Sequence, residues 1–229
     1  MPFVLVHSAG FDSRVWEPVL PHLHASALAV DLPGRRPGGA VVPAGETTGW
    51  TTLDDYADSV ASDVLATGWE DVVLVGHGFA AVTLPRVVAL VPGLIGRLVF
   101  VSGALPRHGE PVRPPDPRHV RGAVTDLPTE AAARARALTV PEPPRVGDDL
   151  ADLTGLRYPV PRSWVRLERD RVVPPARQDV YAERAGCAEV VGLDAPHLAM
   201  IAAPRDLAAV LDRMPAHPAA REETLALHA

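Results

Sequence analysis

The chain alternates short apolar runs with longer stretches in which apolar residues recur at helical spacing. The short runs have the composition of buried β-strands, and they lie at Phe3 to Val6, Ala27 to Val30, Asp71 to Val75, Leu98 to Val101, Trp164 to Leu167 and Ala188 to Val191. The helical stretches lie at Val15 to Leu23, Thr51 or Thr52 to Gly68, Ala80 to Val91, Thr129 to Leu138, Pro175 to Gly186 and Ala203 to Arg213. This alternation predicts an α/β fold with a mostly parallel central sheet that helices cover on both faces.

One segment interrupts the alternation. Residues 104–161 are dense in proline and arginine and contain a single good helical stretch, Thr129 to Leu138. Segments inserted between two core strands commonly shape a substrate site. We therefore expect a core formed by residues 1–103 and 162–214, a short cap insertion at 104–161, and a loosely held C-terminal tail at 215–229.

The third predicted strand leads into a turn that lacks an expected serine. The stretch from Asp71 to Ala80 combines a buried strand, a sharp turn and the start of a helix, which is the arrangement of a nucleophile elbow, G-x-S-x-G. Gly78 stands at the serine position. Either the chain is a serine hydrolase whose nucleophile has been replaced, or it is an enzyme that works without an acyl-enzyme at this position.

Composition narrows the class of protein. A chain of 229 residues suits one domain, and 47% hydrophobic with 22% charged residues is ordinary for a soluble globular protein. The formal net charge of -6 argues against nucleic acid and anionic membrane surfaces as partners. No apolar run is long enough to span a bilayer. We expect a small-molecule substrate as the partner, and the sequence is silent on the oligomeric state.

Cysteine usage and the first residues bear on location. Cys187 is the one cysteine of the sequence, so an intramolecular disulfide and a thiolate metal cluster are excluded. The chain begins Met1-Pro2 and shows neither the basic region nor the small-residue cleavage site of a signal peptide. We expect a cytoplasmic protein that uses no metal and no organic cofactor.

Four segments carry a family resemblance. They are Val4-Leu5-Val6-His7-Ser8-Ala9-Gly10-Phe11, Val73-Leu74-Val75-Gly76-His77-Gly78-Phe79-Ala80, Asp170-Arg171-Val172-Val173-Pro174 and Leu193-Asp194-Ala195-Pro196-His197. With these segments in this order, the chain resembles the α/β-hydrolase fold family, and within it the branch of plant-type methylesterases and hydroxynitrile lyases. The resemblance covers nearly the whole chain apart from the cap and implies the α/β-hydrolase fold.

The resemblance also implies an acid and a base. The family's catalytic order is nucleophile, acid and histidine, which makes His197 the base. Asp170 would hold the His197 ring in the useful tautomer and stabilise the imidazolium. Glu168, two residues upstream of Asp170, is a weaker competitor, because an outward-facing strand residue is its simpler interpretation.

A backbone oxyanion hole is implied as well. Its donors would be the amide of Phe79, which follows the nucleophile position, and the amide of Ala9 in the loop after the first strand. In hydroxynitrile lyases of this branch a hydroxyl residue in that loop contacts the substrate oxygen, so Ser8 either binds substrate or satisfies its own turn. Ser8 replaces the glycine common in the esterase loop, and Ala80 replaces the last elbow glycine.

Four more residues are expected beside the pocket, each with a simpler use. His77 fills the variable position of the elbow, where packing is the simpler role. Ser102 ends the strand after the elbow and either contacts substrate or caps a loop. Phe11 belongs either to the pocket or to the core. His7 opens the loop after the first strand, and we expect it to be structural.

Three functions are compatible with this site. In the first, Gly78 is natural and His197 acts as a base on a small carbonyl or ester-type substrate, in lyase, isomerase, cyclase or decarboxylation chemistry of specialised metabolism. In the second, the natural residue is serine, and this chain is an esterase, lactonase or thioesterase variant that traps its substrate. In the third, the pocket binds a ligand without catalysis. None of them forms an acyl-enzyme at Gly78.

Overall fold

A computed structural model describes residues 1–35, 51–113 and 117–214. Its sheet has six strands, which are β1 (Phe3–Val6), β2 (Ala27–Val30), β3 (Val72–His77), β4 (Ile95–Val101), β5 (Arg162–Leu167) and β6 (Glu189–Leu193). The strand order is β2-β1-β3-β4-β5-β6, and every neighbouring pair is parallel. All six strands fall at the positions that the apolar runs predict, so the α/β fold class is confirmed.

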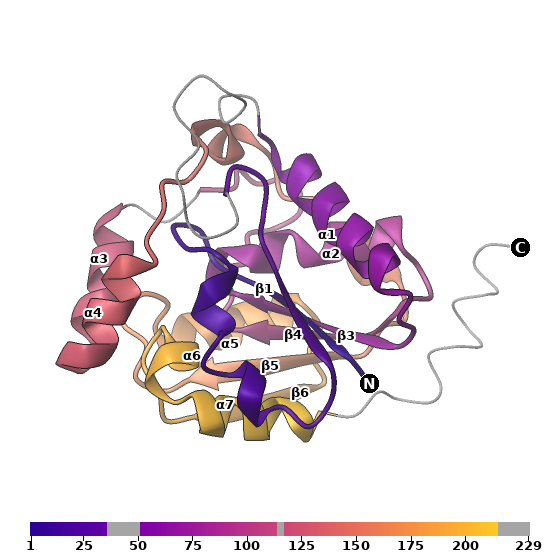
Figure 1. Ribbon diagram of the computed structural model, residues 1–229. Helices are drawn as coiled ribbons and strands as arrows, with labels where there is room; N and C mark the ends of the chain where they lie inside the picture. Colours follow the sequence, from indigo (N-terminus) through magenta and orange to yellow (C-terminus); the bar gives the residue numbers. More distant parts are fainter. Residues whose placement is uncertain (36–50, 114–116, 215–229) are drawn as a thin grey trace, which may run out of the picture.

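Helices cover both faces of this sheet. The α-helices are α1 (Leu53–Thr67), α2 (Leu84–Leu90), α3 (Pro117–Thr125), α4 (Thr129–Ala137), α5 (Pro175–Arg184), α6 (Ala199–Ala202) and α7 (Pro204–Asp212). Figure 1 shows α1 and α2 on one side of the strands and α6 and α7 on the other, with α3 and α4 together at one edge.

The two-sided core follows from strand geometry. Side chains of successive strand residues point to opposite faces, and in β1 both sets are apolar. Val4 and Val6 pack with α1 and α2 in one cluster, whereas Phe3 and Leu5 pack with α6 and α7 in another. Strands that are buried on both faces therefore appear as continuous apolar runs rather than alternating ones.

The ends of α1 illustrate how local sequence sets an element. Thr52 caps the helix in a capping box, in which its hydroxyl accepts from the Asp55 amide and the Asp55 carboxylate accepts from the Thr52 amide. Gly68 ends the helix with a left-handed φ of +64°. The predicted start and end of this helix are confirmed.

Two predicted helices differ from the structure. The stretch from Val15 to Leu23 is two 3₁₀ turns, η1 (Ser13–Trp16) and η2 (Leu20–His22), because Pro18 between them cannot donate the hydrogen bond that a continuous helix needs. The helix after the elbow starts as a 3₁₀ turn, η4 (Gly78–Val82), before α2.

The insertion holds more structure than the sequence predicts. Besides α4 it contains α3 and the 3₁₀ turns η5 (Pro144–Asp148) and η6 (Thr154–Arg157), so the expectation of a single helical stretch is wrong. Ala123 and Val124 of α3 are buried against the α6 and α7 side. The high proline and arginine content hides this short amphipathic helix from a composition argument. The predicted tail at 215–229 lies outside the described residues.

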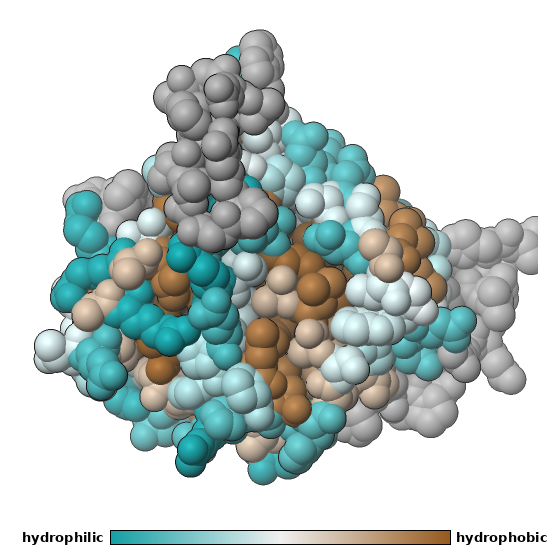
Figure 2. Space-filling model, in the orientation of Figure 1, coloured by the Kyte–Doolittle hydropathy of each residue, from teal (hydrophilic) through white to brown (hydrophobic). Residues whose placement is uncertain are grey.

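The described part of the chain contains no membrane-spanning helix. None of the described helices combines the length and the apolar composition that a bilayer span requires. Figure 2 shows hydrophobic residues gathered in the middle of one face, with hydrophilic residues around them.

Candidate active site

The predicted elbow is present at the carboxyl end of β3. The chain leaves the strand at His77 and turns at Gly78, whose φ is +55°. This left-handed conformation strains any residue with a side chain and suits glycine. Gly76 serves a second need, because a Cβ atom there would lie 2.9 Å from the Leu84 side chain. The two glycines let the strand, the turn and α2 approach closely.

The predicted acid and base meet beside this turn. His197, in the loop after β6, has its Nδ1 2.6 Å from Asp170 Oδ2. Both side chains are buried. Asp170 also accepts at Oδ1 from the amides of Val172 at 2.7 Å and Val173 at 2.9 Å, and at Oδ2 from the Ser102 hydroxyl at 2.5 Å. These contacts fix the carboxylate in one orientation.

The charge of Asp170 sets the tautomer of His197. Burial favours the neutral acid, but the nearby His197 and the hydrogen bonds from His197, Ser102 and Val173 outweigh it and lower the Asp170 pKa. An ionised carboxylate only accepts hydrogen bonds, so His197 Nδ1 carries a proton. The other ring nitrogen, Nε2, lies 3.5 Å from the point where a Cβ atom on Gly78 would be. The basic nitrogen therefore faces the elbow.

The Ser8 hydroxyl occupies part of the predicted oxyanion hole. The Phe79 amide donates to Ser8 Oγ at 3.0 Å. No acceptor among the described residues pairs with the other predicted donor, the Ala9 amide. The same Ser8 Oγ lies 2.5 Å from the Cβ position of Gly78. The loop after β1 thus places a hydroxyl over the elbow at the position that lacks one.

His7 holds this loop through hydrogen bonds at both ring nitrogens. Its Nε2 accepts from the Leu32 amide at 3.1 Å, so Nδ1 carries the proton and donates to the Ser8 carbonyl at 2.9 Å. Burial, assisted by the charge of Arg35, lowers the pKa of His7 to about 4. With both nitrogens used and the ring neutral, His7 has the structural geometry that the sequence predicts.

His77 supports the base from behind. Its Nε2 donates to the His197 carbonyl at 2.9 Å, and the two ring centroids are 4.5 Å apart. Burial, together with the neighbouring His197, lowers the pKa of His77 well below its usual value. Its Nδ1 has no partner among the described residues. This neutral ring packs against the loop that carries His197, which is the simpler of the two roles expected for it.

The remaining predicted residues divide between the site and the core. Ser102 donates its hydroxyl to Asp170 and has a positive φ of 42°, a conformation that costs energy and often marks functional sites. Phe11 is buried in the cluster with α6 and α7. Glu168 is exposed and pairs with the half-buried Arg166. Burial raises the pKa of the Cys187 thiol to about 12, so Cys187 is not a reactive thiolate.

Gln178 is a site-supporting residue that the sequence does not predict. From α5 its Oε1 accepts from the Leu167 amide at 3.0 Å, and its Nε2 donates to the carbonyls of Leu167 at 3.1 Å and Val173 at 2.7 Å. The side chain is fully buried. It bridges both ends of the loop that carries Asp170. A glutamine at helical spacing on an otherwise polar helix gives no sequence signal for this role.

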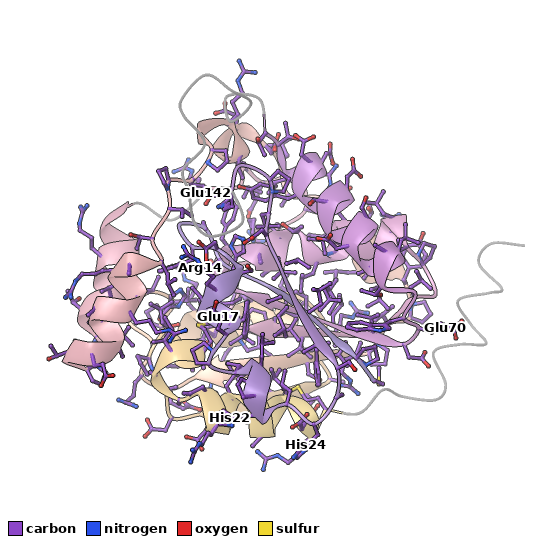
Figure 3. The ribbon with its side chains drawn as sticks, viewed as in Figure 1. Arg14, Glu17, His22, His24, Glu70 and Glu142 are labelled. Carbon is purple, nitrogen blue, oxygen red and sulfur yellow. The ribbon has the colours of Figure 1, made fainter. Side chains whose placement is uncertain are left out.

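Glu142 of the insertion is a second unpredicted residue. It accepts from the Gly10 amide at 2.9 Å, from the Tyr56 hydroxyl at 2.7 Å and from the Arg35 guanidinium. Val140 adds a backbone bond to the Gly10 carbonyl at 2.9 Å. Figure 3 shows Glu142 above Arg14 in the same view. The insertion is therefore fastened to the loop that carries Ser8 and Ala9.

A metal centre has no support in the described part of the chain. The residues at 1–35, 51–113 and 117–214 contain no group of three or more histidine, cysteine, aspartate or glutamate side chains placed to hold an ion. Asp170 and His197 face each other and backbone amides, which is the donor set of an acid and base pair.

Comparisons with known proteins bear on this arrangement. The model of the alpha/beta hydrolase family matches residues 3–210. Among curated proteins, an esterase of Mycobacterium tuberculosis, Rv0045c, is 30% identical over 115 residues, which are 47% of this chain and 35% of that protein. The chain therefore aligns with about a third of that relative's length.

Solved structures share the fold at low identity. An extracellular alpha/beta-hydrolase from a Paenibacillus species has a TM-score of 0.78 and 18% identity, covering 92% of this chain and 97% of that one. A methylesterase from Arabidopsis has a TM-score of 0.75, 21% identity and coverage of 93% and 98%. A tomato methylketone synthase I variant complexed with β-ketoheptanoate has a TM-score of 0.72, 19% identity and coverage of 92% and 95%.

Proposed function

Because this chain belongs to the alpha/beta hydrolase family, we propose that it is an enzyme in which His197 and Asp170 act as an acid–base pair on a small carbonyl or ester substrate. The Ala9 and Phe79 amides stabilise the developing oxyanion, and no covalent intermediate forms at Gly78. The observation that carries the proposal is the direction of His197 Nε2, which lies 3.5 Å from the Cβ position of Gly78 while Nδ1 is held by Asp170.

The chemistry follows from which atoms are free. Nε2 removes a proton from a substrate carbon, from a hydroxyl or from a water that lies over Gly78, and Asp170 stabilises the imidazolium that results. Electron density then moves onto a substrate oxygen. That oxygen is stabilised by the Ala9 amide and by the Phe79 amide, once the substrate displaces the Ser8 hydroxyl from Phe79.

Two reaction classes use this machinery. Hydrolysis of an ester is supported by the partial relative, which is named an esterase. Chemistry without hydrolysis is supported by the neighbour named a methylketone synthase, complexed with a β-keto acid. A methyl ketone forms from a β-keto acid when carbon dioxide leaves and an enolate is protonated. The enolate oxygen is an oxyanion of the kind that these amides stabilise, and the step needs no nucleophile.

The test compares base variants on one substrate of each class, p-nitrophenyl butyrate and β-ketoheptanoate. We expect His197→Gln to lower kcat by about 10² to 10⁴ and Asp170→Asn by about 10⁴, on whichever substrate is turned over. The matched control is His24→Gln, because the His24 side chain is 91% exposed on the surface; its kcat should equal that of the unaltered protein.

Two results would count against the proposal. Full turnover by His197→Gln would remove His197 as the base. Absence of turnover on both substrates, with ligand binding that His197→Gln leaves unchanged, would instead favour a ligand-binding protein without catalysis.

A further inference from the structure

The hydroxyl missing from the elbow is supplied from another loop. We propose that Ser8 is the nucleophile of an ester-cleaving reaction and forms the acyl-enzyme that Gly78 cannot form. The inference rests on the proposed function, because it uses the same base, and it narrows the substrate class to carboxylic esters.

Space at the elbow is the first argument. A Cβ atom on Gly78 would lie 2.5 Å from Ser8 Oγ and 3.0 Å from Ser8 Cβ. Atoms that are not bonded do not approach so closely, so a side chain at position 78 and the present orientation of Ser8 exclude each other. Glycine at position 78 is what lets the Ser8 hydroxyl enter the region where an elbow nucleophile stands.

The Ser8 hydroxyl also lies close to groups that can activate it as a nucleophile. The Phe79 amide donates to Ser8 Oγ at 3.0 Å, and a donor at this atom stabilises negative charge on it. His197 Nε2 lies 3.5 Å from the same Cβ position that Ser8 Oγ approaches. The two atoms share no hydrogen bond in this structure. A catalytic hydrogen bond often tightens only when substrate binds, so the proposal requires Ser8 Oγ and His197 Nε2 to approach each other in the complex with substrate.

The backbone around Ser8 offers the same amide donor as a nucleophile elbow does. In an elbow the amide of the residue after the nucleophile belongs to the oxyanion hole, and here that residue is Ala9. The His7 ring fixes the loop by donating to the Ser8 carbonyl at 2.9 Å. The other buried hydroxyl of the site, Ser102, is already committed to Asp170 at 2.5 Å. Ser8 is thus the site hydroxyl that is not used to orient the acid.

The reaction proceeds in two balanced steps. Ser8 Oγ attacks the ester carbonyl carbon as its proton passes to His197 Nε2, and the carbonyl electron pair moves onto oxygen. Collapse of this intermediate breaks the bond to the alkoxy group, which leaves with the proton from His197. A water then attacks the acyl-Ser8 carbonyl and gives a proton to His197. The bond between the acyl carbon and Ser8 Oγ breaks, and His197 returns the proton to Ser8 Oγ as the carboxylic acid leaves.

The experiment is covalent trapping with diisopropyl fluorophosphate, read by intact mass and by peptide mapping. We expect one adduct, on the peptide that contains Ser8. Ser8→Ala and His197→Gln should each lower the labelling rate at least about 10²-fold, since one removes the nucleophile and the other its base. Ser8→Ala should lower the hydrolysis of p-nitrophenyl butyrate by the same factor. Ser62→Ala, an exposed serine of α1, is the matched control and should label as the unaltered protein does.

A double variant makes a negative result informative. Ser8→Gly with Gly78→Ser moves the hydroxyl back to the elbow and should label on the peptide that contains residue 78. If this variant labels there while the unaltered protein takes no label on Ser8, the pocket is competent and the Ser8 proposal is wrong. The proposal is also wrong if Ser8→Ala keeps full esterase turnover, or loses it although Ser8 never takes a label.

The acid–base function of His197 and the nucleophile assignment of Ser8 fail in different experiments. If turnover survives His197→Gln, the acid–base function is wrong whatever Ser8 does. If turnover requires His197 and Ser8 takes no label, only the nucleophile assignment fails.

Discussion

At the scale of single residues, Gly78 and Ser8 compete for one place. Gly78 has a left-handed φ of +55°. The Ser8 Oγ atom lies 2.5 Å from the position that a Cβ atom on Gly78 would occupy. Glycine at position 78 therefore meets two requirements: it adopts the left-handed turn without strain, and it leaves room for the Ser8 hydroxyl. The effect of restoring serine at position 78 consequently depends on what stands at position 8.

Gly78→Ser tests this competition through stability. We expect it to lower the free energy of unfolding by about 1 to 3 kcal/mol for backbone strain, with a further loss from the contact with Ser8. Adding Ser8→Gly should recover the free energy lost to the contact with Ser8 and leave the loss from backbone strain unchanged. The measurement is urea unfolding of the single variants and the double variant, with a coupling of about 0.5 to 3 kcal/mol expected for residues in contact.

Gly68→Ser is the control for strain alone. Gly68 also has a positive φ, +64°, but apart from its own local backbone no heavy atom of the described residues lies within 4 Å of the position of its added Cβ. This substitution should show the backbone cost, and Ser8→Gly should not relieve it. Equal losses for Gly68→Ser and Gly78→Ser, with no coupling to Ser8, would show that the Ser8 hydroxyl does not constrain position 78.

At the scale of elements, the insertion and the loop after β1 depend on each other. Glu142 joins Gly10, Tyr56 and Arg35, and the Arg35 side chain has no exposed surface while that of Glu142 is 15% exposed. Removing one partner of a buried ion pair leaves the other charge without compensation. The position of the loop after β1 therefore depends on a carboxylate from a distant element.

Glu142→Ala is expected to lower the free energy of unfolding by about 3 to 5 kcal/mol. It should also speed hydrogen exchange at the Gly10 amide, which loses its acceptor. Glu17→Ala is the matched control, because Glu17 and Arg134 form a pair in which both side chains are about half exposed; its effect should stay within about 1 kcal/mol. A Gly10 amide that exchanges equally slowly in both variants would contradict the assignment.

At the scale of the whole molecule, the sequence predicts the features that a short contiguous stretch of residues encodes. The six strands follow from apolar runs and the elbow from a short pattern at the end of a strand, whereas Asp170 and His197 are implied by the family resemblance. These residues meet because the carboxyl ends of parallel strands lie at one edge of the sheet. The orientation of Ser8 depends on a residue 70 positions later, and the contact of Glu142 with Gly10 spans 132 positions. Such pairs leave no local pattern. They become visible only when packing brings their elements together.

Buried histidines give the whole molecule a pH dependence of defined sign. His7 has its pKa lowered to about 4, and that of His77 is lowered too, so both rings are neutral when folded. In the unfolded chain a histidine titrates near 6.5. Between these values the unfolded state binds protons that the folded state does not, so the stability present above pH 6.5 is lost as the pH falls toward 4.

His7→Gln isolates one part of this dependence. A pKa lowered from 6.5 to about 4 corresponds to roughly 3 kcal/mol lost by pH 4. Urea unfolding at pH 7.5, 6.0 and 5.0 should give a shallower slope for His7→Gln than for the unaltered protein, even though the variant is less stable at pH 7.5. Ser62→Ala should leave the slope unchanged, because it removes no titrating group. An equal slope for His7→Gln would mean that His7 is protonated to the same extent in both states, which the hydrogen bond from the Leu32 amide to its Nε2 opposes.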